Sequence, residues 1–152
     1  MNNFNNVHGF LTQNQKLHSR IAEFYQSLTK DAENQRTKLL LDILIKHELE
    51  LLDFVSAYLD KAPNKTQEAF IQFDPEENLD ALFSTDFNHA QVTSQQVEVL
   101  ADRFNQYFSN IYQGISQSNE SQEVQKVFDH LHQHSEQKKK QLSIDINEMH
   151  DI

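Results

Sequence analysis

The chain has 152 residues, enough for one domain with a substantial hydrophobic core, and its formal net charge is −10. This acidic balance argues against binding to nucleic acid or to an anionic membrane surface, because basic side chains supply most of the affinity in both cases. The chain has no Cys, which excludes disulfides, thiolate metal sites and cysteine nucleophiles.

The first long helix is expected to follow a polar, irregular N-terminal stretch. Gly9 breaks the pattern there, and Thr12 is a suitable N-cap for a helix that runs to about Lys30. The whole chain has only two Gly and two Pro, so few positions interrupt the helical pattern. The apolar face of this helix consists of Leu17, Ile21, Phe24, Tyr25 and Leu28.

The second long helix is predicted at about 35–61, after a polar turn at 31–34, and it ends before Pro63. Two long helices joined by so short a turn must pack antiparallel, which predicts a first hairpin over about 12–61. One stripe at helical spacing faces the core, and His47 is its only polar member: Leu40, Leu44, His47, Leu51, Phe54 and Tyr58.

A crossover is predicted over about 62–93, with a short helix near 77–84. It is long enough to run back along a helix of about 25 residues, so we expect the third long helix to begin at the same end as the first. Its aromatic residues either cover the helices or form a dimer face: Phe70, Phe73, Phe83 and Phe87.

The second hairpin is predicted over about 94–145. Thr93 and Ser94 are good caps for its first helix, and Gly114 lies near the end of that helix. A polar run leads to the second helix at about 122–145, and the last residues either extend this helix or lie across a neighbour. The two apolar faces are Val97, Leu100, Ala101, Phe104, Phe108, Ile111 and Ile115, then Val124, Val127, Phe128, Leu131, His134 and Leu142.

The second hairpin matches the first without gaps at an offset of 87 residues, which indicates an internal duplication. Any two antiparallel hairpins with seven-residue stripes can be aligned in some register, so coincidence is the alternative. On the duplicated arrangement His47 and His134 face each other, either as a hydrogen-bonded polar pair or as half of a metal site. The identical pairs are Tyr25/Tyr112, Gln26/Gln113, Glu33/Glu120, Gln35/Gln122, Asp42/Asp129, Leu44/Leu131 and His47/His134.

Three short patterns carry a resemblance to a known family: Phe24-Tyr25-x-x-Leu28, Asn34-x-Arg36-x-Lys38-Leu39-Leu40 and Leu44-x-x-His47-Glu48. With two repeated hairpins and one long crossover, the chain resembles the ferritin-like superfamily, and within it the rubrerythrin-type branch. The resemblance covers most of the chain outside the crossover. It implies an all-α fold, a ferritin-like four-helix bundle formed by residues 1–152 as a single domain.

Di-iron members of this family use one Glu from each of two helices and a Glu-x-x-His pair from each of the other two. Only Glu48 retains the expected ligand, and a Lys at a ligand position would place a cation where the metal belongs. The resemblance therefore does not carry over the oxidase, peroxidase or iron-storage chemistry of the family. The corresponding positions are His18 or Ser19, Glu48, Leu51, Asn105 or Gln106, Ser135 and Lys138.

Substitute metal ligands are nevertheless present. His18, His47, Glu48 and His134 converge if the helix register allows, and Asp129-x-x-His132 has the spacing of two ligands on one helix face. Imidazole and carboxylate groups suit Fe or Zn. The alternative for Asp129 and His132 is an ordinary solvated helix face.

Two functional interpretations follow. The first is a non-enzymatic interaction or scaffold protein that has lost di-iron chemistry, with no catalytic residue and no cofactor, acting as a homodimer or through a protein partner. The second is a protein that binds Fe or Zn at a rearranged His/carboxylate site, with redox activity. No secretory signal or apolar run of ~20 residues is present, so we expect a cytoplasmic protein.

Overall fold

The computed structural model describes residues 6–71, 79–84, 91–119 and 121–151. Within these ranges the protein is helical without strands, and an isolated antiparallel bridge joins Asn6 to Phe70. The predicted all-α class is therefore confirmed. The helices are α1 (Val7–Asp31), α2 (Gln35–Lys61), α3 (Asn64–Glu68), α4 (Asp80–Phe83), α5 (Ser94–Ser118) and α6 (Gln122–His150).

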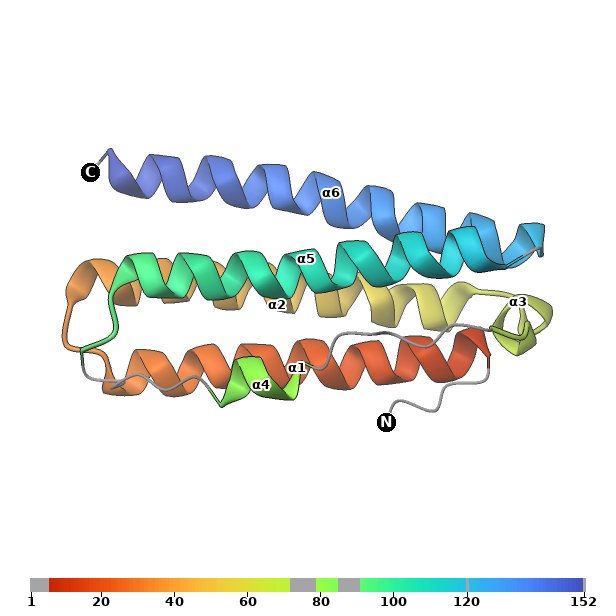
Figure 1. Cartoon of the computed structure of the whole chain (residues 1–152), viewed down its shortest axis with the longest axis horizontal. Coiled ribbons are helices and arrows are strands. Elements are labelled where there is room, and N and C mark those ends of the chain that lie inside the picture. Colours follow the sequence, from red (N-terminus) through yellow and green to blue (C-terminus); the bar gives the residue numbers. More distant parts are fainter. Residues whose placement is uncertain (1–5, 72–78, 85–90, 120, 152) are drawn as a thin grey trace.

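Four long helices, α1, α2, α5 and α6, lie lengthwise beside one another (Figure 1). The closest partners are α1 with α2 and α5 with α6, and α2 also packs against both α5 and α6. A single hydrophobic cluster contains buried side chains from all four. Each helix therefore depends on the others for burial of its apolar stripe, which is the main source of helix stability in water.

The direction of α5 differs from the prediction. Helix α5 begins where α1 ends, beside the start of α2, and runs parallel to α2 (Figure 1). The hydroxyl of Thr37, in the first turn of α2, lies 3.5 Å from the carbonyl oxygen of Val92, just before α5. The prediction was wrong because α1 and α2 are antiparallel, so a connection that returns along α2 reaches the end of α1 and not its start.

The first helix begins earlier than predicted. It starts at Val7 because the side chain of Asn6 accepts a hydrogen bond of 2.8 Å from the Gly9 amide and so caps it. Gly9 lies inside the helix and does not break it. The added turn buries Val7, Phe10 and Leu11 in the core, and this burial outweighs the low helix propensity of Gly9.

The remaining long helices agree more closely with the sequence pattern. Helix α2 has the predicted bounds, and Thr93 forms a capping box with Gln96 at the start of α5. Gly114 lies within α5, which continues to Ser118. Of the two expectations for the C-terminal residues, the extension is confirmed: α6 continues to His150 and buries Met149.

In its described residues the crossover contains two short helices, α3 and α4, of which only the second was predicted. Leu79, Leu82 and Ile71 are buried, and Phe83 contacts Phe24 of α1 at a centroid distance of 5.5 Å. The crossover thus covers the long helices at these points, although Phe70 is exposed. Phe73 and Phe87 lie outside the described residues. No helix in the described ranges is both long and apolar enough to cross a membrane.

Candidate functional site

Five buried polar side chains lie near the midpoints of the four long helices, and we call them the polar core cluster: His18, His47, Glu48, Asn105 and Ser135. Every long helix contributes at least one member. Burial of polar groups is costly unless they are hydrogen-bonded, so their partners decide what this cluster can do.

His18 and Glu48 form the tightest contact of the cluster. The Nδ1 atom of His18 lies 2.7 Å from Oε2 of Glu48, and each residue is only 1 % exposed. The imidazole also stacks on Phe108, with ring centroids 4.3 Å apart and an interplanar angle of 19°. Its other nitrogen, Nε2, is buried without a hydrogen-bond partner in the described part of the chain. The ring is thus held firmly, with one polar atom unsatisfied.

His47 is bonded to a different helix. Its Nε2 atom lies 3.3 Å from Oδ1 of Asn105 on α5. Because burial disfavours the charged imidazolium, the pKa of His47 is lowered, although Glu48 and the bond to Asn105 partly oppose this shift. We predicted a hydrogen bond between His47 and His134, and the observed partner, Asn105, corrects that expectation.

His134 lies outside the polar core cluster. Its ring is half-buried and stacks on Phe54 of α2, with centroids 3.5 Å apart and an angle of 6°. Burial, together with the charge of Lys138, lowers the pKa of His134 to about 4. The predicted face-to-face pair with His47 is not formed, because the aromatic ring of Phe54 takes the place of the second imidazole.

Asp129 and His132 have separate partners on α5. Asp129 is exposed and accepts a hydrogen bond of 2.6 Å from Ser116. His132 lies 3.2 Å from the hydroxyl of Ser109 and 3.7 Å from a carboxylate oxygen of Glu136. The i, i+3 spacing therefore places the two residues on adjacent turns, where each contacts its own serine.

The two tyrosines of the matched pair are both buried beside the cluster. The pKa of Tyr25 is raised well above its usual value by burial and by the charge of Glu48. The side-chain amide of Asn14 donates a hydrogen bond of 2.7 Å to the Tyr112 hydroxyl. Burial also raises the pKa of Tyr112, although the bond from Asn14 opposes this shift, so both phenols stay protonated and neutral at physiological pH.

The cluster does not fit the two-iron ligand set of ferritin-like di-iron proteins. It holds one carboxylate, Glu48, which is engaged by His18. At the remaining ligand positions Leu51 is apolar and buried, and Lys138 reaches outward to Glu50 at 2.6 Å. Across the described ranges, no group of three or more His, Asp or Glu side chains is arranged to hold a metal ion.

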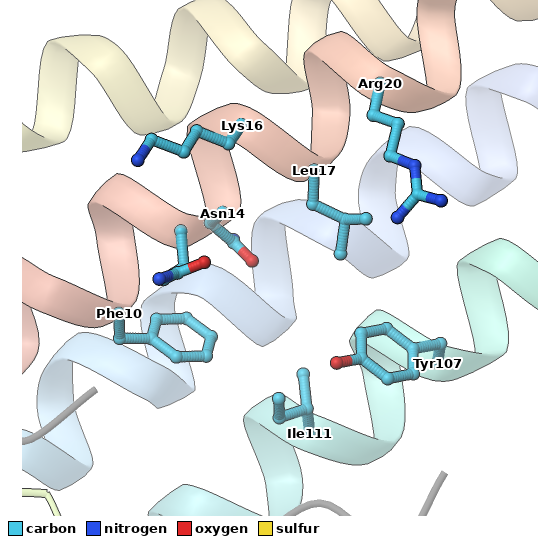
Figure 2. Close-up of a pocket in the computed structure, with 8 residues that line it drawn as sticks. Phe10, Asn14, Lys16, Leu17, Arg20, Tyr107 and Ile111 are labelled. Carbon is cyan, nitrogen blue, oxygen red and sulfur yellow. The ribbon is translucent and has the colours of Figure 1, made fainter. Parts of the chain in front are cut away.

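A pocket of about 160 Å³ opens between α1 and α5 (Figure 2). Lys16 and Arg20 lie at its exposed edge, and Phe10, Leu17 and Ile111 supply apolar walls. Arg20 is already bonded to Asp80 at 2.9 Å. Because its cations are exposed or engaged elsewhere, the pocket defines no particular class of ligand.

Sequence reasoning treated Asn105 and Ser135 only as lost ligand positions and did not expect them in a shared cluster with His47. The internal repeat could have indicated both residues, because Asn105 and Ser135 follow His18 and Glu48 by 87 residues. No protein-family profile, curated protein or solved structure matches the chain. The ferritin-like assignment therefore stays a prediction from the resemblance.

Proposed function

We propose that this protein is a ferritin-like four-helix bundle that has lost di-iron chemistry and serves as a non-enzymatic interaction or scaffold protein. The helix directions support the bundle topology, since one long crossover makes α5 parallel to α2, as in ferritin-like folds. The polar core cluster at the helix midpoints supports the same assignment, because the metal ligands of that family project inward from all four helices.

Burial along the chain supports the internal repeat. At the offset of 87 residues, buried positions in α1 and α2 meet buried positions in α5 and α6, including polar ones. A chance alignment of two apolar stripes would not be expected to match buried polar positions as well. The pairs buried in both halves include His18/Asn105, Ile21/Phe108, Tyr25/Tyr112, Leu28/Ile115, Leu40/Val127, Leu41/Phe128, Leu44/Leu131 and Glu48/Ser135.

The observation that carries the loss of di-iron chemistry is the closed contact between His18 and Glu48. The carboxylate that would bind iron is committed to an internal imidazole at 2.7 Å. The matching positions on α5 and α6 hold Asn105 and Ser135, which are neutral groups and weak metal ligands. In this proposal the cluster orients the four helices relative to one another and does no chemistry.

One end of the four long helices offers a region for self-association. His150 contacts both Arg36 and Glu98, so the starts of α2 and α5 meet the end of α6. Three large apolar side chains near this end are about half exposed: Leu39 at 49 %, Val99 at 58 % and Ile144 at 51 %. Exposed apolar side chains gathered at one end favour a homodimer formed there.

The proposal is tested by two measurements on untagged protein purified without chelator. Elemental analysis should find iron and zinc well below one atom per chain, and light scattering coupled to size exclusion should give the mass of a dimer. Val99→Lys should shift the protein toward monomer, whereas Gln117→Lys, at an exposed site near the other end of α5, should not. Stoichiometric core metal or a monomeric wild type would contradict the respective part of the proposal.

A second candidate function, binding of Fe or Zn in the core, is favoured by one specific observation. If Nδ1 of His18 donates to Glu48, the buried Nε2 atom carries a free lone pair, as in metal sites where a carboxylate orients a ligating histidine. Titration with iron or zinc would then raise the thermal stability of the wild type. His18→Gln should remove this effect and His8→Gln, on an exposed surface, should preserve it.

A further inference from the structure

A second pair of histidines lies outside the polar core cluster, where α6 packs against α2. His130 and His134 are four residues apart on α6, and both contact Phe54 of α2. His134 stacks on Phe54, and the ring of His130 meets Phe54 and Tyr58 edge-on, each at a centroid distance of 5.7 Å. The spacing of one turn and the shared contact with Phe54 place both imidazoles on one face of the helix.

These two imidazoles differ from their neighbour in having no hydrogen bond to any other residue in the described ranges. His132, which lies between them in sequence, is bonded to Ser109 and paired with Glu136. His130 is exposed and His134 is half-buried, so the pair is accessible from solvent. Unpaired ring nitrogens at an accessible site remain available to an external ligand.

We propose that His130 and His134 form a two-imidazole site for a divalent transition-metal ion, with Cu²⁺ bound most tightly. Two His residues at i and i+4 on one helix face are a recurring arrangement for binding a metal through imidazole nitrogen. Imidazole suits Cu²⁺, Ni²⁺ and Zn²⁺, and Cu²⁺ has the highest affinity of this series for nitrogen ligands. Water completes the coordination at the solvent side.

The surroundings of the pair favour binding in two ways. Phe54 restrains the ring of His134, so less side-chain freedom is lost when the metal binds. Lys138, whose charge acts on His134, is bonded to Glu50 at 2.6 Å, and this carboxylate offsets that charge. The site involves no member of the polar core cluster, so it extends the proposed function and does not depend on it.

The test is titration of the untagged full chain with Cu²⁺ at pH 7.5, followed by calorimetry and by electron paramagnetic resonance. The wild type should bind one Cu²⁺ with hyperfine structure from two nitrogen ligands. His130→Gln and His134→Gln should each weaken binding by at least ~10-fold, the size of loss that even a supporting residue of a metal site can cause. His132→Gln is the matched control on the same turn and should leave binding unchanged.

Three outcomes would overturn the site: no Cu²⁺ binding by the wild type, unchanged affinity in His130→Gln, or an equal loss in His132→Gln. His130 is exposed, so its replacement tests the site without disturbing the core. A metal that is lost in His18→Gln and kept in His130→Gln would instead locate binding in the core. That result would contradict the proposed function as well, whereas loss in His130→Gln alone would not.

Discussion

The two halves of the polar core cluster have buried positions in common but differ in whether the side chains at these positions are ionisable. In α1 and α2 the cluster holds ionisable groups, His18 and Glu48, each 1 % exposed. At the positions 87 residues later, α5 and α6 hold the neutral side chains of Asn105 and Ser135, which are also buried. The comparison teaches that helix register decides whether a position is buried. The type of residue at that position decides how much stability is lost when its partner is removed.

His47 and His134 give the same lesson in a milder form. His47 is buried and bonded to Asn105, whereas His134 is half-buried and stacked on Phe54. Both imidazoles have a lowered pKa because burial disfavours their charged form. Only His47 leaves a buried polar partner behind when it is replaced, so the two positions should respond differently to the same change.

The largest loss of stability should come from removing one partner of the buried pair formed by His18 and Glu48. Glu48→Ala leaves His18 buried without its partner, and it should lower the free energy of unfolding by about 3–5 kcal/mol. Ser135→Ala, at the matched position of the second half, should cost less than about 1.5 kcal/mol. Urea denaturation followed by circular dichroism measures both values. Similar costs for the two variants would contradict the distinction between the halves.

Replacing the whole pair provides the control for that prediction. The double variant His18→Leu with Glu48→Met removes both ionisable groups and keeps a similar volume. Its free energy of unfolding should return close to the wild-type value or exceed it, because no unpaired polar group remains. A double variant as unstable as Glu48→Ala would show that packing, and not an orphaned partner, explains the loss.

The next largest change in stability is expected from replacing His47, in comparison with His134. His47→Leu leaves the Asn105 amide buried and unpaired, so it should cost about 1–3 kcal/mol in chemical denaturation. His134→Phe keeps a stacked ring on Phe54 and should change stability by less than about 0.5 kcal/mol. If the His134 variant proved the more costly of the two, the stacked ring would contribute more than the buried hydrogen bond.

A smaller effect is expected from pH. The folded-state pKa values of His47 and His134, the latter about 4, lie below the ordinary value of 6.5, so the unfolded chain binds more protons in between. The free energy of unfolding is therefore not reduced by these two groups above about pH 6.5, and it declines as pH falls toward 4. After allowance for screening of the half-buried ring, we expect a loss of about 1–2 kcal/mol between pH 7 and pH 5.

Denaturation curves at several pH values measure this slope. The variant His134→Phe lacks one of the two groups and should show a shallower decline over the same range. His8→Gln, which removes an exposed histidine, is the matched control and should retain the wild-type slope. An identical slope in the His134 variant would show that other groups cause the acid sensitivity.

The smallest effect compares the caps of α2 and α6, which also lie 87 residues apart. Asn34 accepts from the Thr37 amide at 3.1 Å, and Ser121 accepts from the Val124 amide at 3.4 Å. Asn34→Ala should therefore cost about 1 kcal/mol, and Ser121→Ala about 0.5 kcal/mol, because the longer bond is weaker. Equilibrium denaturation resolves the difference, and Asn34→Asp should retain the cap.

Much of the fold could be predicted from local pattern. The bounds of α2 and the apolar stripe of α5 followed from helical periodicity, which depends only on residues three and four apart. The start of α1 could not be predicted in this way. Gly9 has a low helix propensity, but the tertiary burial of Phe10 and Leu11 outweighs it.

The candidate site was predicted only in part. His18, His47 and Glu48 were named from the sequence, and the structure places all three in the polar core cluster. Their partners depend on how the helices rotate against each other, and an individual imidazole has several possible partners within reach. The sequence therefore did not identify Asn105 as the partner of His47, or Phe54 as the ring on which His134 stacks.

The sequence by itself determined the helical class, the two-hairpin order and the residues available for the core, because these follow from spacing along the chain. Only the tertiary structure decided the direction of α5, the pairing of His18 with Glu48 and the separate environment of His130 and His134. The physical reason is that periodicity acts within one helix. Contacts between helices depend on crossover path, rotation and register, which many sequence-distant side chains set together.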